Sequence, residues 1–403
     1  MDRRFKGLPA GWAGRTPADI CADTPALFGE SGREGPFSPL CVLDADALAH
    51  NLATMARWCG DHGVELAPHG KTHMAPQLLA RQFAAGARAV TAATISQVRT
   101  FRAYGVREIV LANQLVDVAG LFWLTAEYGA DADFRLVCWV DSPTGVTIMN
   151  RALDAAGMSR PLEVCVEVGA RGGRTGCRSA AEIDAVVRAV LAAPHLRLVG
   201  VAGYEAALGH DVSAAAQESI RGYLTTMRDS TILLAPLFEC DEPMVTAGGS
   251  THFDLVAETL TDWPAGLSVR TVLRSGCYLT HDDGLYQRTS PLTRVGSQGL
   301  QPAMSVWAQV GSRPEPELGL ATMGRRDVSF DQGLPVPRNA PGAVVTALND
   351  QHAFLALPAT STIAVGDWLQ FGISHPCTTF DKWQLIPVLD RNNRVVDLIR
   401  TFF

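Results

Sequence analysis

The sequence lacks the features that mark membrane, secreted and nucleic-acid-binding proteins. No apolar run in its 403 residues reaches the length that a membrane-spanning helix needs. The first residues, MDRRFKGLPAGW, are charged, but no apolar segment of the kind found in secretion signals follows them. The formal net charge of −7 argues against nucleic acid or an anionic membrane surface as the main partner. We therefore expect a cytoplasmic protein with no nucleic-acid partner and no membrane partner.

Paired cysteines are also missing. The nine cysteines are scattered and form no CxxC motif. In a chain without a secretion signal, such a set is typical of reduced thiols, most of them small buried apolar residues. Apolar material, in contrast, is plentiful: the chain is 47% hydrophobic and 19% charged. This composition suits a globular protein with a large core, and the length exceeds that of one ordinary domain.

Short β-branched runs alternate with alanine-rich stretches between about residues 40 and 275. The stretches carry apolar residues at spacings of three and four, as in PQLLARQFAAG, and most end at Gly or before Pro, as helices do. Strand–helix alternation predicts a parallel sheet, and eight units over roughly 230 residues fit a (β/α)8 barrel of TIM type. An open doubly wound sheet is the alternative. The eight expected strands are residues 64–69, 87–92, 108–113, 134–140, 162–168, 196–203, 244–249 and 268–273.

The pattern changes after about residue 275. Segments such as AMSVWAQVG, DVSF, GAVVTALND, HAFLAL, DWLQFG and WQLIPVLD are short, often alternate in polarity, and are separated by Pro and Gly. They predict antiparallel β structure, to which the earlier segment 39–48 is expected to add a strand, whereas residues 311–318 are expected to form a loop. The fold class is therefore α/β, with a barrel over residues 45–275. A second, mainly antiparallel β domain is expected from residues 1–44 together with 276–403.

A glycine-rich segment follows the seventh expected strand, where barrels of this kind place their chemistry. The segment is TAGGSTHFD, residues 246–254. Its two glycines expose backbone N–H groups, and Ser250 or Thr251 can cap the helix that is expected to follow. The segment therefore predicts an anion or phosphate cradle. A plain Gly-rich turn is the alternative interpretation.

Lys71 follows the first barrel strand, in LAPHGKTHMAP. A lysine in an enclosed site can lose its proton and attack an aldehyde. Together with a phosphate cradle, it suggests pyridoxal phosphate held as a Schiff base. His69, Thr72 and His73 offer polar contacts, and His69 would share a face with Lys71 if the strand extended that far. A surface lysine in a loop is the alternative.

A histidine and a cysteine form the second constellation, in GISHPCTTFDKW, residues 372–383. His375 and Cys377 are two residues apart, a spacing that places both side chains on one face of an extended segment. Imidazole and thiolate together suit zinc, and two protein ligands leave positions open, as a catalytic metal requires. A buried cysteine beside a hydrogen-bonding histidine is the alternative, which the spacing alone favours.

These segments resemble one known family. PHGKTHMAP is similar to the cofactor-lysine motif of the D-serine dehydratase and D-threonine aldolase family, and HPCTT matches the family's H-x-C-x-T run. GGRTG, GYE, AGGS and SGCYLTHD match more loosely, and the resemblance extends along most of the chain. It implies a fold-type III pyridoxal phosphate enzyme with an alanine-racemase-like barrel and a β domain.

The resemblance also implies roles for single residues. Lys71 becomes the Schiff-base lysine, and His375 and Cys377 become ligands of Zn²⁺ or another divalent metal. The implied cofactor contacts, which include the phosphate site at the glycine-rich segment, are His69, Gln97, Arg174, Tyr204, Gly248, Gly249, Ser250 and Tyr278.

Two further residues carry no assigned role. Asp282 lies in the segment that leads into the β domain, and His352 lies in LNDQH, which is less acidic than the corresponding segment of the family.

The implied function is a lyase acting on a small amino-acid substrate, a β-hydroxy D-amino acid. Displaced Lys71 would take the α-proton, the cofactor ring would store the electrons, and the metal would help the hydroxyl to leave. The products are a keto acid and ammonia, as for a D-serine dehydratase. Retro-aldol cleavage to glycine and an aldehyde is the closest alternative, and cysteine as the second metal ligand favours the dehydratase by resemblance. A homodimer is expected, because active sites of this fold usually form at a dimer interface.

Two other functions remain as alternatives. An amino-acid racemase needs no metal but needs a second base on the opposite face, for which Tyr204 is a candidate. A non-enzymatic protein that binds pyridoxal phosphate would be a single barrel. The region after residue 275, with its His-Cys pair, argues against that class.

Overall fold

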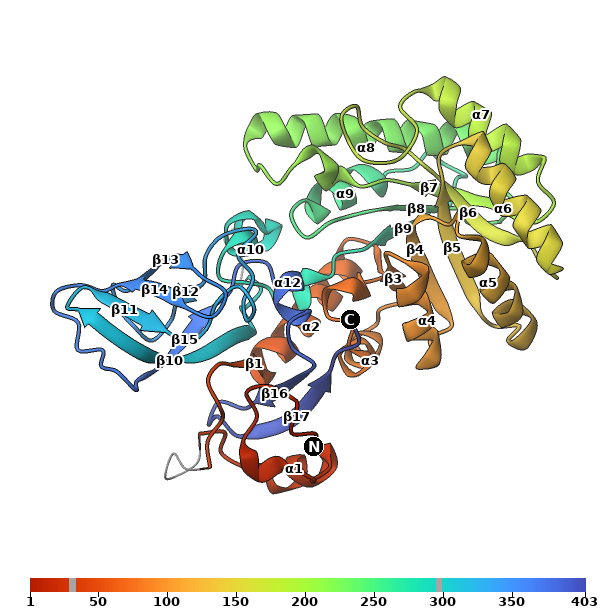
Figure 1. Cartoon of the computed structure of the whole chain (residues 1–403). Coiled ribbons are helices and arrows are strands. Elements are labelled where there is room, and N and C mark those ends of the chain that lie inside the picture. The colour runs from red at the N-terminus through yellow and green to blue at the C-terminus, as the bar shows by residue number, and fades with distance from the viewer. Residues whose placement is uncertain (29–33, 295–298) are drawn as a thin grey trace. The chain divides into compact units, whose positions relative to one another are not determined.

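The computed structural model describes residues 1–28, 34–294 and 299–403 (Figure 1). Internal contacts divide the chain into two compact units. The barrel unit comprises Ala56–Lys71 and Gln82–Gly276, and the β unit comprises Met1–Met55, Thr72–Arg81 and Cys277–Phe403. A boundary between the two units falls inside the lysine motif, because Lys71 belongs to the barrel unit and Thr72 to the β unit.

Eight parallel strands form the sheet of the barrel unit, in the order β2-β9-β8-β7-β6-β5-β4-β3. The two ends of this order also meet: His69, just past β2, pairs with Thr91 of β3, and the Thr91 N–H donates to the carbonyl of Pro68 at 2.9 Å. The predicted (β/α)8 barrel is therefore confirmed, and all eight strands coincide with those expected from the sequence. They are β2 (Glu65–Leu66), β3 (Val90–Ala92), β4 (Glu108–Gln114), β5 (Arg135–Val140), β6 (Leu162–Glu167), β7 (Leu196–Ala202), β8 (Met244–Ala247) and β9 (Arg270–Leu273).

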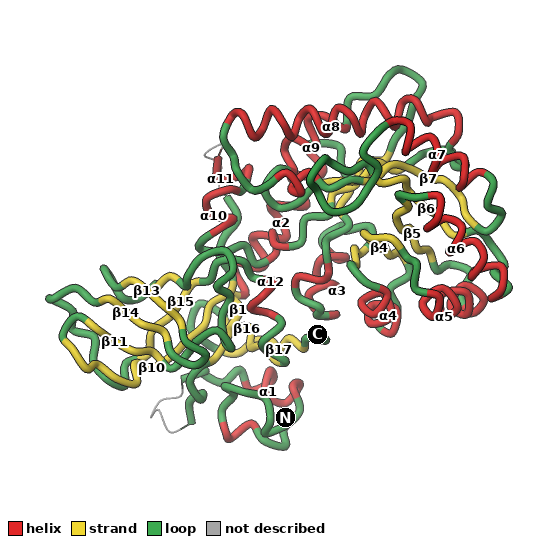
Figure 2. Tube along the Cα trace, turned by 45° about the horizontal axis from the view of Figure 1, so that its top comes forward, coloured by secondary structure: helices red, strands yellow, loops and turns green. Residues whose placement is uncertain are grey.

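Helices lie around these strands (Figure 2). The five α-helices between Ile95 and Leu234 each follow a side chain that accepts a backbone N–H group, as a helix N-cap does. In α6, for example, Ser142 accepts from the N–H of Gly145 at 3.2 Å, and Gly157 ends the helix with a φ of 73°. Two helices begin in the β unit and end in the barrel unit, α2 (Ala45–Asp61) and α3 (Pro76–Ala84). The helices that lie wholly in the barrel unit are α4 (Ile95–Ala103), α5 (Val118–Ala130), α6 (Pro143–Ala156), α7 (Ala180–Leu191), α8 (Ala214–Leu234) and α9 (Phe253–Leu260).

The barrel interior is a packed core. Side chains from six of its strands, β4 to β9, meet there with Ala67 and Ala89, which adjoin β2 and β3, and Trp139 is the largest of them. Because such a core leaves no channel, a ligand can bind only at an end of the barrel. The buried members of this core are Ala67, Ala89, Val110, Trp139, Cys165, Val199, Ala202, Met244 and Val272.

A nine-stranded sheet organises the β unit, and all its strand pairs except β1–β16 are antiparallel. This confirms the predicted antiparallel β region, and β1 pairs with β10 and β16, as expected for segment 39–48. The strands are β1 (Leu40–Asp44), β10 (Met304–Glu315), β11 (Leu318–Ala321), β12 (Val336–Pro337), β13 (Val344–Leu348), β14 (Ala353–Ala356), β15 (Trp368–Gly372), β16 (Leu385–Leu389) and β17 (Val395–Arg400). The short helices of this unit are α1 (Pro17–Asp23), α10 (Leu285–Thr289), α11 (Pro291–Arg294) and α12 (Cys377–Phe380).

Two expectations for the β unit are wrong. Residues 311–318 are not a loop, because β10 continues to Glu315 and pairs with β11. The pairing shifts register between Ser312 and Glu315, and such a bulge tolerates the missing N–H of Pro314. The segment DVSF, residues 327–330, forms no strand; it lies in a turn where the Ser329 N–H donates to Thr379 Oγ1 at 2.9 Å. Among the described residues, no helix combines the length and the apolar character needed to cross a membrane.

Candidate active site

The lysine motif lies directly past the carboxyl end of β2, as predicted. The chain is not extended as far as Lys71, however: residues Gly70–Thr72 form a 3-10 turn, so the expected strand face shared by His69 and Lys71 is wrong. The turn is possible because Gly70 lies against the barrel wall, where a Cβ atom would come within 2.4 Å of Phe101 Cζ. The side chain of Lys71 is exposed, so a cofactor aldehyde can reach it.

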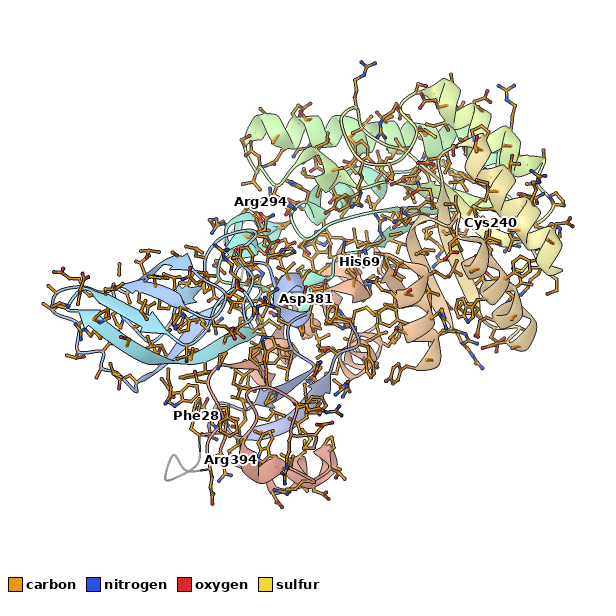
Figure 3. The ribbon with its side chains drawn as sticks, viewed as in Figure 1. Phe28, His69, Cys240, Arg294, Asp381 and Arg394 are labelled. Atoms are coloured by element: carbon orange, nitrogen blue, oxygen red, sulfur yellow. The ribbon has the colours of Figure 1, made fainter. Side chains whose placement is uncertain are left out.

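His69 presents a shielded nitrogen at the same end of the barrel. Its Nδ1 is buried and has no hydrogen-bond partner within the described part of the chain. Burial first, and then the positive charges of Lys71 and Arg274, hold the pKa of His69 well below its usual value. His69 is therefore neutral near pH 7 and can bind a ligand through this nitrogen. His69 follows β2 in the chain, whereas Cys240 precedes the amino end of β8; Figure 3 labels both residues.

The glycine-rich segment after β8 binds an anionic group through its backbone. The N–H groups of Gly248 and Gly249 donate to the two oxygens of the buried Glu205 carboxylate, at 2.9 and 2.6 Å. Gly248 has a φ of 98°, and a Cβ atom there would lie 2.6 Å from Leu273 Cδ2. Ser275 Oγ lies 3.2 Å from the carbonyl oxygens of both glycines. The glycines therefore present a pair of backbone amides that bind an anion, which in this structure is the carboxylate of Glu205.

The expected helix cap in this segment is wrong. Helix α9 begins at Phe253, with His252 rather than Ser250 or Thr251 at the N-cap position. Residues 250–252 form a turn between the two glycines and the helix, which moves the helix start downstream. Ser250 is half-buried in this turn.

Arg174 and Tyr204 are brought together, as their predicted roles require. The guanidinium of Arg174 lies 4.5 Å from the centre of the Tyr204 ring, and the same ring lies within 3.2 Å of the position that a Cβ of Gly249 would occupy. These contacts join the segments after β6, β7 and β8. Gln97 has a different environment: its Oε1 accepts the N–H of Ala93 at 2.7 Å, a local contact before α4.

Three charged residues at this end of the barrel were not predicted from the sequence. Buried Arg274 donates to Thr246 Oγ1 and to the carbonyl of Gly203, both at 2.6 Å. Burial raises the pKa of Glu167, whose oxygens accept hydrogen bonds from Gln114 and Thr175. Glu205 is the third. Glu167 is the second-to-last residue of the strand expected at 162–168, and Arg274 directly follows the strand expected at 268–273. The available signal was therefore a charged residue at the end of a strand.

The His-Cys motif of the β unit is a turn, so the expected extended segment is wrong. His375 has a φ of 73°, and Pro376 is the N-cap of α12, which begins at Cys377. Buried Asp282 holds this turn: its Oδ2 accepts the N–H of His375 at 2.9 Å, and its Oδ1 accepts that of Tyr286 at 2.8 Å. Burial raises the pKa of Asp282, and these hydrogen bonds oppose the shift. Asp282 therefore positions the backbone of the motif.

A carboxylate orients the His375 ring. Its Nδ1 lies 2.6 Å from Asp331 Oδ2, and Thr378 Oγ1 donates to Asp331 Oδ1 at 2.8 Å. Burial opposes ionisation of Asp331, but the hydrogen bonds from Thr378 and His375 outweigh it and lower the pKa. A carboxylate on one imidazole nitrogen is the usual arrangement behind a metal-binding histidine, and it leaves Nε2 as the ligand atom. Asp331 was not predicted from the sequence.

Cys377 lies beside a second cysteine. Its Sγ is 3.4 Å from Cys277 Sγ and 3.4 Å from Thr72 Oγ1. Within residues 1–28, 34–294 and 299–403, no three His, Cys, Asp or Glu side chains are gathered so that they could hold a metal. The β unit therefore contains two partial donor groups, a His–Asp pair and a pair of thiols.

The two remaining predicted residues of the β unit differ in burial. Tyr278 is buried in the 3-10 turn Cys277–Leu279. His352 is exposed in the turn between β13 and β14, where its carbonyl accepts the N–H of Asn349 at 2.9 Å. His352 therefore acts in this turn through its backbone.

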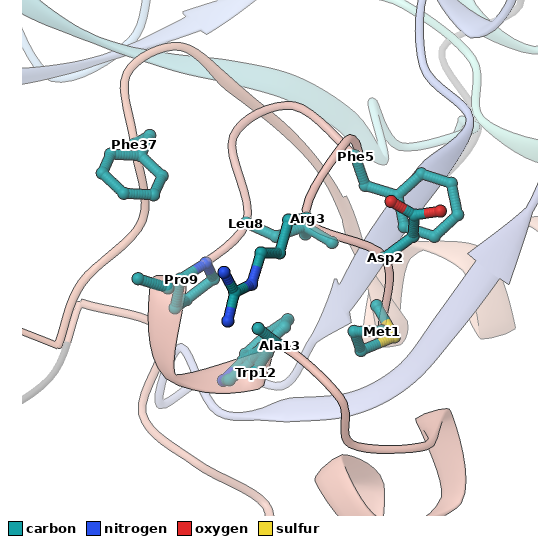
Figure 4. A pocket seen from close by; sticks show the side chains of 10 residues that line it. Met1, Asp2, Arg3, Phe5, Leu8, Pro9, Trp12, Ala13 and Phe37 are labelled. Carbon is teal, nitrogen blue, oxygen red and sulfur yellow. The ribbon is translucent and has the colours of Figure 1, made fainter.

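A pocket of about 390 Å³ lies elsewhere, at the N-terminal segment of the β unit (Figure 4). The side chain of Arg3 reaches between Pro9 and Trp12 there. None of the candidate residues lines it. The lining residues are Met1, Asp2, Arg3, Phe5, Leu8, Pro9, Ala10, Trp12, Ala13 and Phe37.

The fold and the barrel-end groups together define a class. The chain combines a (β/α)8 barrel with an antiparallel β unit. In the barrel, a lysine follows the first strand and an anion-binding glycine pair follows the seventh. Alanine-racemase-like pyridoxal phosphate enzymes have this arrangement. Residues 43–296 match the family model of the alanine racemase N-terminal domain. Residues 303–389 match that of the serine dehydratase domain.

Comparison with individual proteins narrows the class. The chain is 28% identical over 353 residues to D-threonine aldolase of Arthrobacter sp, a match that covers 85% of this chain and 86% of that protein. The crystal structure of D-threonine aldolase from Filomicrobium marinum is similar in fold, with a TM-score of 0.78, 24% identity, and coverage of 91% of this chain and 95% of that one. The structure of D-threo-3-hydroxyaspartate dehydratase from Delftia sp. HT23 is also similar in fold, with a TM-score of 0.73 and 22% identity. That match covers 91% of this chain and 97% of the dehydratase chain.

The chain belongs to the alanine-racemase-like family that includes the D-threonine aldolases and the D-serine dehydratase type of enzyme. It is an enzyme of the pyridoxal-phosphate-dependent lyase class.

Proposed function

We propose that the enzyme removes water from β-hydroxy D-amino acids and releases a keto acid and ammonia, with Lys71 as the cofactor lysine and a metal at the His-Cys motif. The observation that carries this proposal is that the second proposed metal ligand of the His-Cys motif is a thiol, that of Cys377. By family resemblance, a cysteine at this position favours dehydratases and a carboxylate favours aldolases.

Lys71 is supported as the cofactor lysine by elimination. The chain has only three lysines, Lys6, Lys71 and Lys382. Lys6 Nζ is 2.8 Å from Asp327 Oδ1 and lies over the ring of Trp383, and Lys382 Nζ is 3.2 Å from Asp381 Oδ1. Both of these lysines belong to the β unit, whereas Lys71 lies at the carboxyl end of a barrel strand.

The barrel-end residues fit pyridoxal phosphate by their chemistry. Bound there, the cofactor supplies an aldehyde for the amine and a ring that stores electrons. The amides of Gly248 and Gly249 donate hydrogen bonds to an anion, so the phosphate would bind them and Ser250 after displacing Glu205. The shielded Nδ1 of His69 and the Arg174–Tyr204 pair would contact the rest of the cofactor. Gln97 and Tyr278 are further proposed contacts.

In the reaction, the chain's own residues move protons and hold groups in place. Lys71 Nζ accepts the proton from the α-carbon of the substrate. His69 remains neutral, because its low pKa keeps a second proton off the imidazole, and it would orient the cofactor. His375 Nε2 and Cys377 Sγ would hold a metal ion, with Asp331 fixing the imidazole. A divalent ion at these donors supplies Lewis acidity to the β-hydroxyl.

Zinc is the proposed metal, because imidazole and thiolate donors favour it over magnesium or calcium. A structure of a D-threo-3-hydroxyaspartate dehydratase in which a cysteine is replaced by alanine is in the metal-free form. This supports a cysteine ligand in a relative. For the present chain, we further propose a cytoplasmic homodimer, with residues 45–275 binding the cofactor and residues 1–44 with 276–403 carrying the metal ligands.

Aldol cleavage is the second candidate function. It is favoured by the 28% identity to the D-threonine aldolase of Arthrobacter sp. It would use the same lysine and metal, but the Cα–Cβ bond would break, and the products would be glycine and an aldehyde. A racemase would give neither set of products.

Product analysis separates these functions. The holoenzyme is treated with a chelator, and zinc is added back to one half of the sample. Both halves are then incubated separately with D-serine, D-threonine and D-threo-3-hydroxyaspartate. Keto acid and ammonia in the zinc-loaded sample support the dehydratase. Glycine with an aldehyde identifies the aldolase, and formation of only the substrate's Cα epimer would refute both lyase reactions.

A further inference from the structure

The pocket of about 390 Å³ in the β unit is lined by residues of the segment 1–13 and by Phe37 (Figure 4). Backbone contacts hold these two parts of the wall together. Gly7 has a φ of 81°, and a Cβ atom there would come within 2.6 Å of the carbonyl oxygen of Pro39. The carbonyl of Gly7 accepts the N–H of Phe37 at 2.9 Å, and that of Pro9 accepts the N–H of Trp12 at 3.1 Å. The backbone therefore shapes the pocket in advance of a ligand, which lowers the cost of binding.

Most of the lining of this pocket is apolar. Leu8 and Trp12 are each only 6% exposed, and Phe5 and Phe37 add two further rings. Small-molecule sites typically enclose about 300–1,000 Å³ between apolar and aromatic walls and use a few polar groups to orient the ligand. The volume and the lining of the pocket both agree with this description.

A positive charge in the pocket is not balanced by a carboxylate. The side chain of Arg3 reaches between Pro9 and Trp12 (Figure 4), and it forms no ion pair within the part of the chain that the structure describes. Among the described lining residues, only Asp2 carries a carboxylate. Arg4 engages that group, with its Nε 2.9 and 3.0 Å from the two oxygens. An unbalanced cation between apolar walls favours an anion with an apolar body.

We propose that this pocket binds a small monocarboxylate with an aromatic or branched apolar body. The carboxylate would accept two parallel hydrogen bonds from the guanidinium of Arg3, a geometry that suits both groups. The apolar body would lie against the rings of Trp12 and Phe37. One guanidinium balances one negative charge, which favours a monocarboxylate over a dicarboxylate. None of the candidate cofactor or metal residues lines the pocket, so this inference does not rest on the proposed function.

Fluorine NMR of 4-fluorobenzoate measures the binding. The holoenzyme is titrated into the ligand, line broadening gives the dissociation constant, and 4-fluorobenzamide serves as the uncharged analogue of the same shape. Arg3→Gln is expected to weaken binding of the acid at least about tenfold, because charge-assisted hydrogen bonds are lost. Arg15→Gln is the matched control and should bind as the wild-type protein does, since Arg15 pairs with Asp23 and does not line the pocket. Ala13→Leu retains Arg3 but narrows the pocket, and it should also weaken binding.

The inference is overturned if Arg3→Gln and Arg15→Gln bind the acid equally, or if the wild-type protein binds the acid and the amide equally. Absence of line broadening with the wild-type protein at millimolar ligand would overturn it as well.

Photolabelling locates the ligand without a variant. The wild-type holoenzyme is irradiated with 4-benzoylbenzoate, digested with trypsin and examined by mass spectrometry. An adduct in the peptide of residues 7–15, which contains Leu8 and Trp12, supports the pocket as the site. Adducts confined to other peptides refute it.

Discussion

The barrel unit and the β unit hold their candidate groups in different ways. In the barrel unit, the groups lie at the ends of regular strands, and two backbone amides of a glycine pair bind the carboxylate of Glu205. In the β unit, the groups are side chains on turns, and each turn is held by residues far away in sequence, as Asp282 holds His375. The comparison shows that a repeating fold can supply an anion site from its backbone. A site of soft metal ligands, in contrast, depends on side chains from separate segments.

Replacing the cofactor lysine should give the largest effect and should affect the barrel unit alone. Lys71→Ala is expected to abolish the visible absorption of the bound cofactor and its fixation by borohydride, because the other two lysines lie in the β unit in ion pairs. Lys382→Ala is the matched control and should keep both. A borohydride-stable adduct in Lys71→Ala would show that the assignment is wrong, and zinc content should be the same in both variants.

Removing the carboxylate behind His375 should affect only the β unit. Asp331→Asn is expected to weaken zinc binding by about 10- to 100-fold, the usual cost of losing the partner of a metal-binding histidine. The visible absorption of the cofactor should persist. Asp350→Asn removes an exposed partner of Arg326 and serves as the control. Equal zinc affinity in the two variants would remove Asp331 from the metal site.

A buried histidine should make the stability of the β unit depend on pH. Burial lowers the pKa of His281 to about 4, so below pH 6.5 the unfolded chain takes up a proton that the folded chain does not. The stability is present above pH 6.5 and is lost as the pH falls towards 4, by about 2 kcal/mol at pH 5. Asn tolerates the φ of 47° at this position.

Urea unfolding of the wild-type protein and of His281→Asn at pH 7 and pH 5 measures this effect. The difference in unfolding free energy between the two pH values should be smaller in the variant. The same difference in both proteins would mean that His281 is protonated in the folded state as readily as in the unfolded chain.

The smallest effect is expected at the glycine pair of the barrel unit. A side chain at Gly249 would crowd Glu205 Oε1 and the Tyr204 ring, both 3.2 Å from the position of its Cβ. Gly249→Val should therefore weaken cofactor binding about tenfold, since a hydrogen bond to a charged group contributes ~1.5 kcal/mol or more. Gly222→Val is the control, because a Cβ there meets nothing within 4 Å. Unchanged cofactor affinity in a folded Gly249→Val protein would exclude this glycine as a phosphate site.

Much of the barrel unit could be predicted from the sequence because its pattern is local and repeated. Each strand is a short apolar run, and most are followed by a helical stretch with apolar residues at spacings of three and four, so eight strands and the positions of Lys71 and Gly248 follow from spacing. The lysine motif and the HPCTT run also placed the chain in its family. Residues 311–318 were misjudged, because Pro and Gly suggested a loop, whereas a bulge allowed the hairpin β10–β11.

The sequence by itself determined the order of the elements, the family, and which segments carry reactive residues. Only the tertiary structure decided which of these residues meet. Glu205 binds the glycine amides, Asp331 binds His375, and Cys277 lies against Cys377, in pairs separated by 43 to 100 residues. Local periodicity carries no information about such pairs, because they depend on where separate segments cross. The left-handed backbone of His375 has the same origin, since the hydrogen bond to Asp282 holds the turn in place.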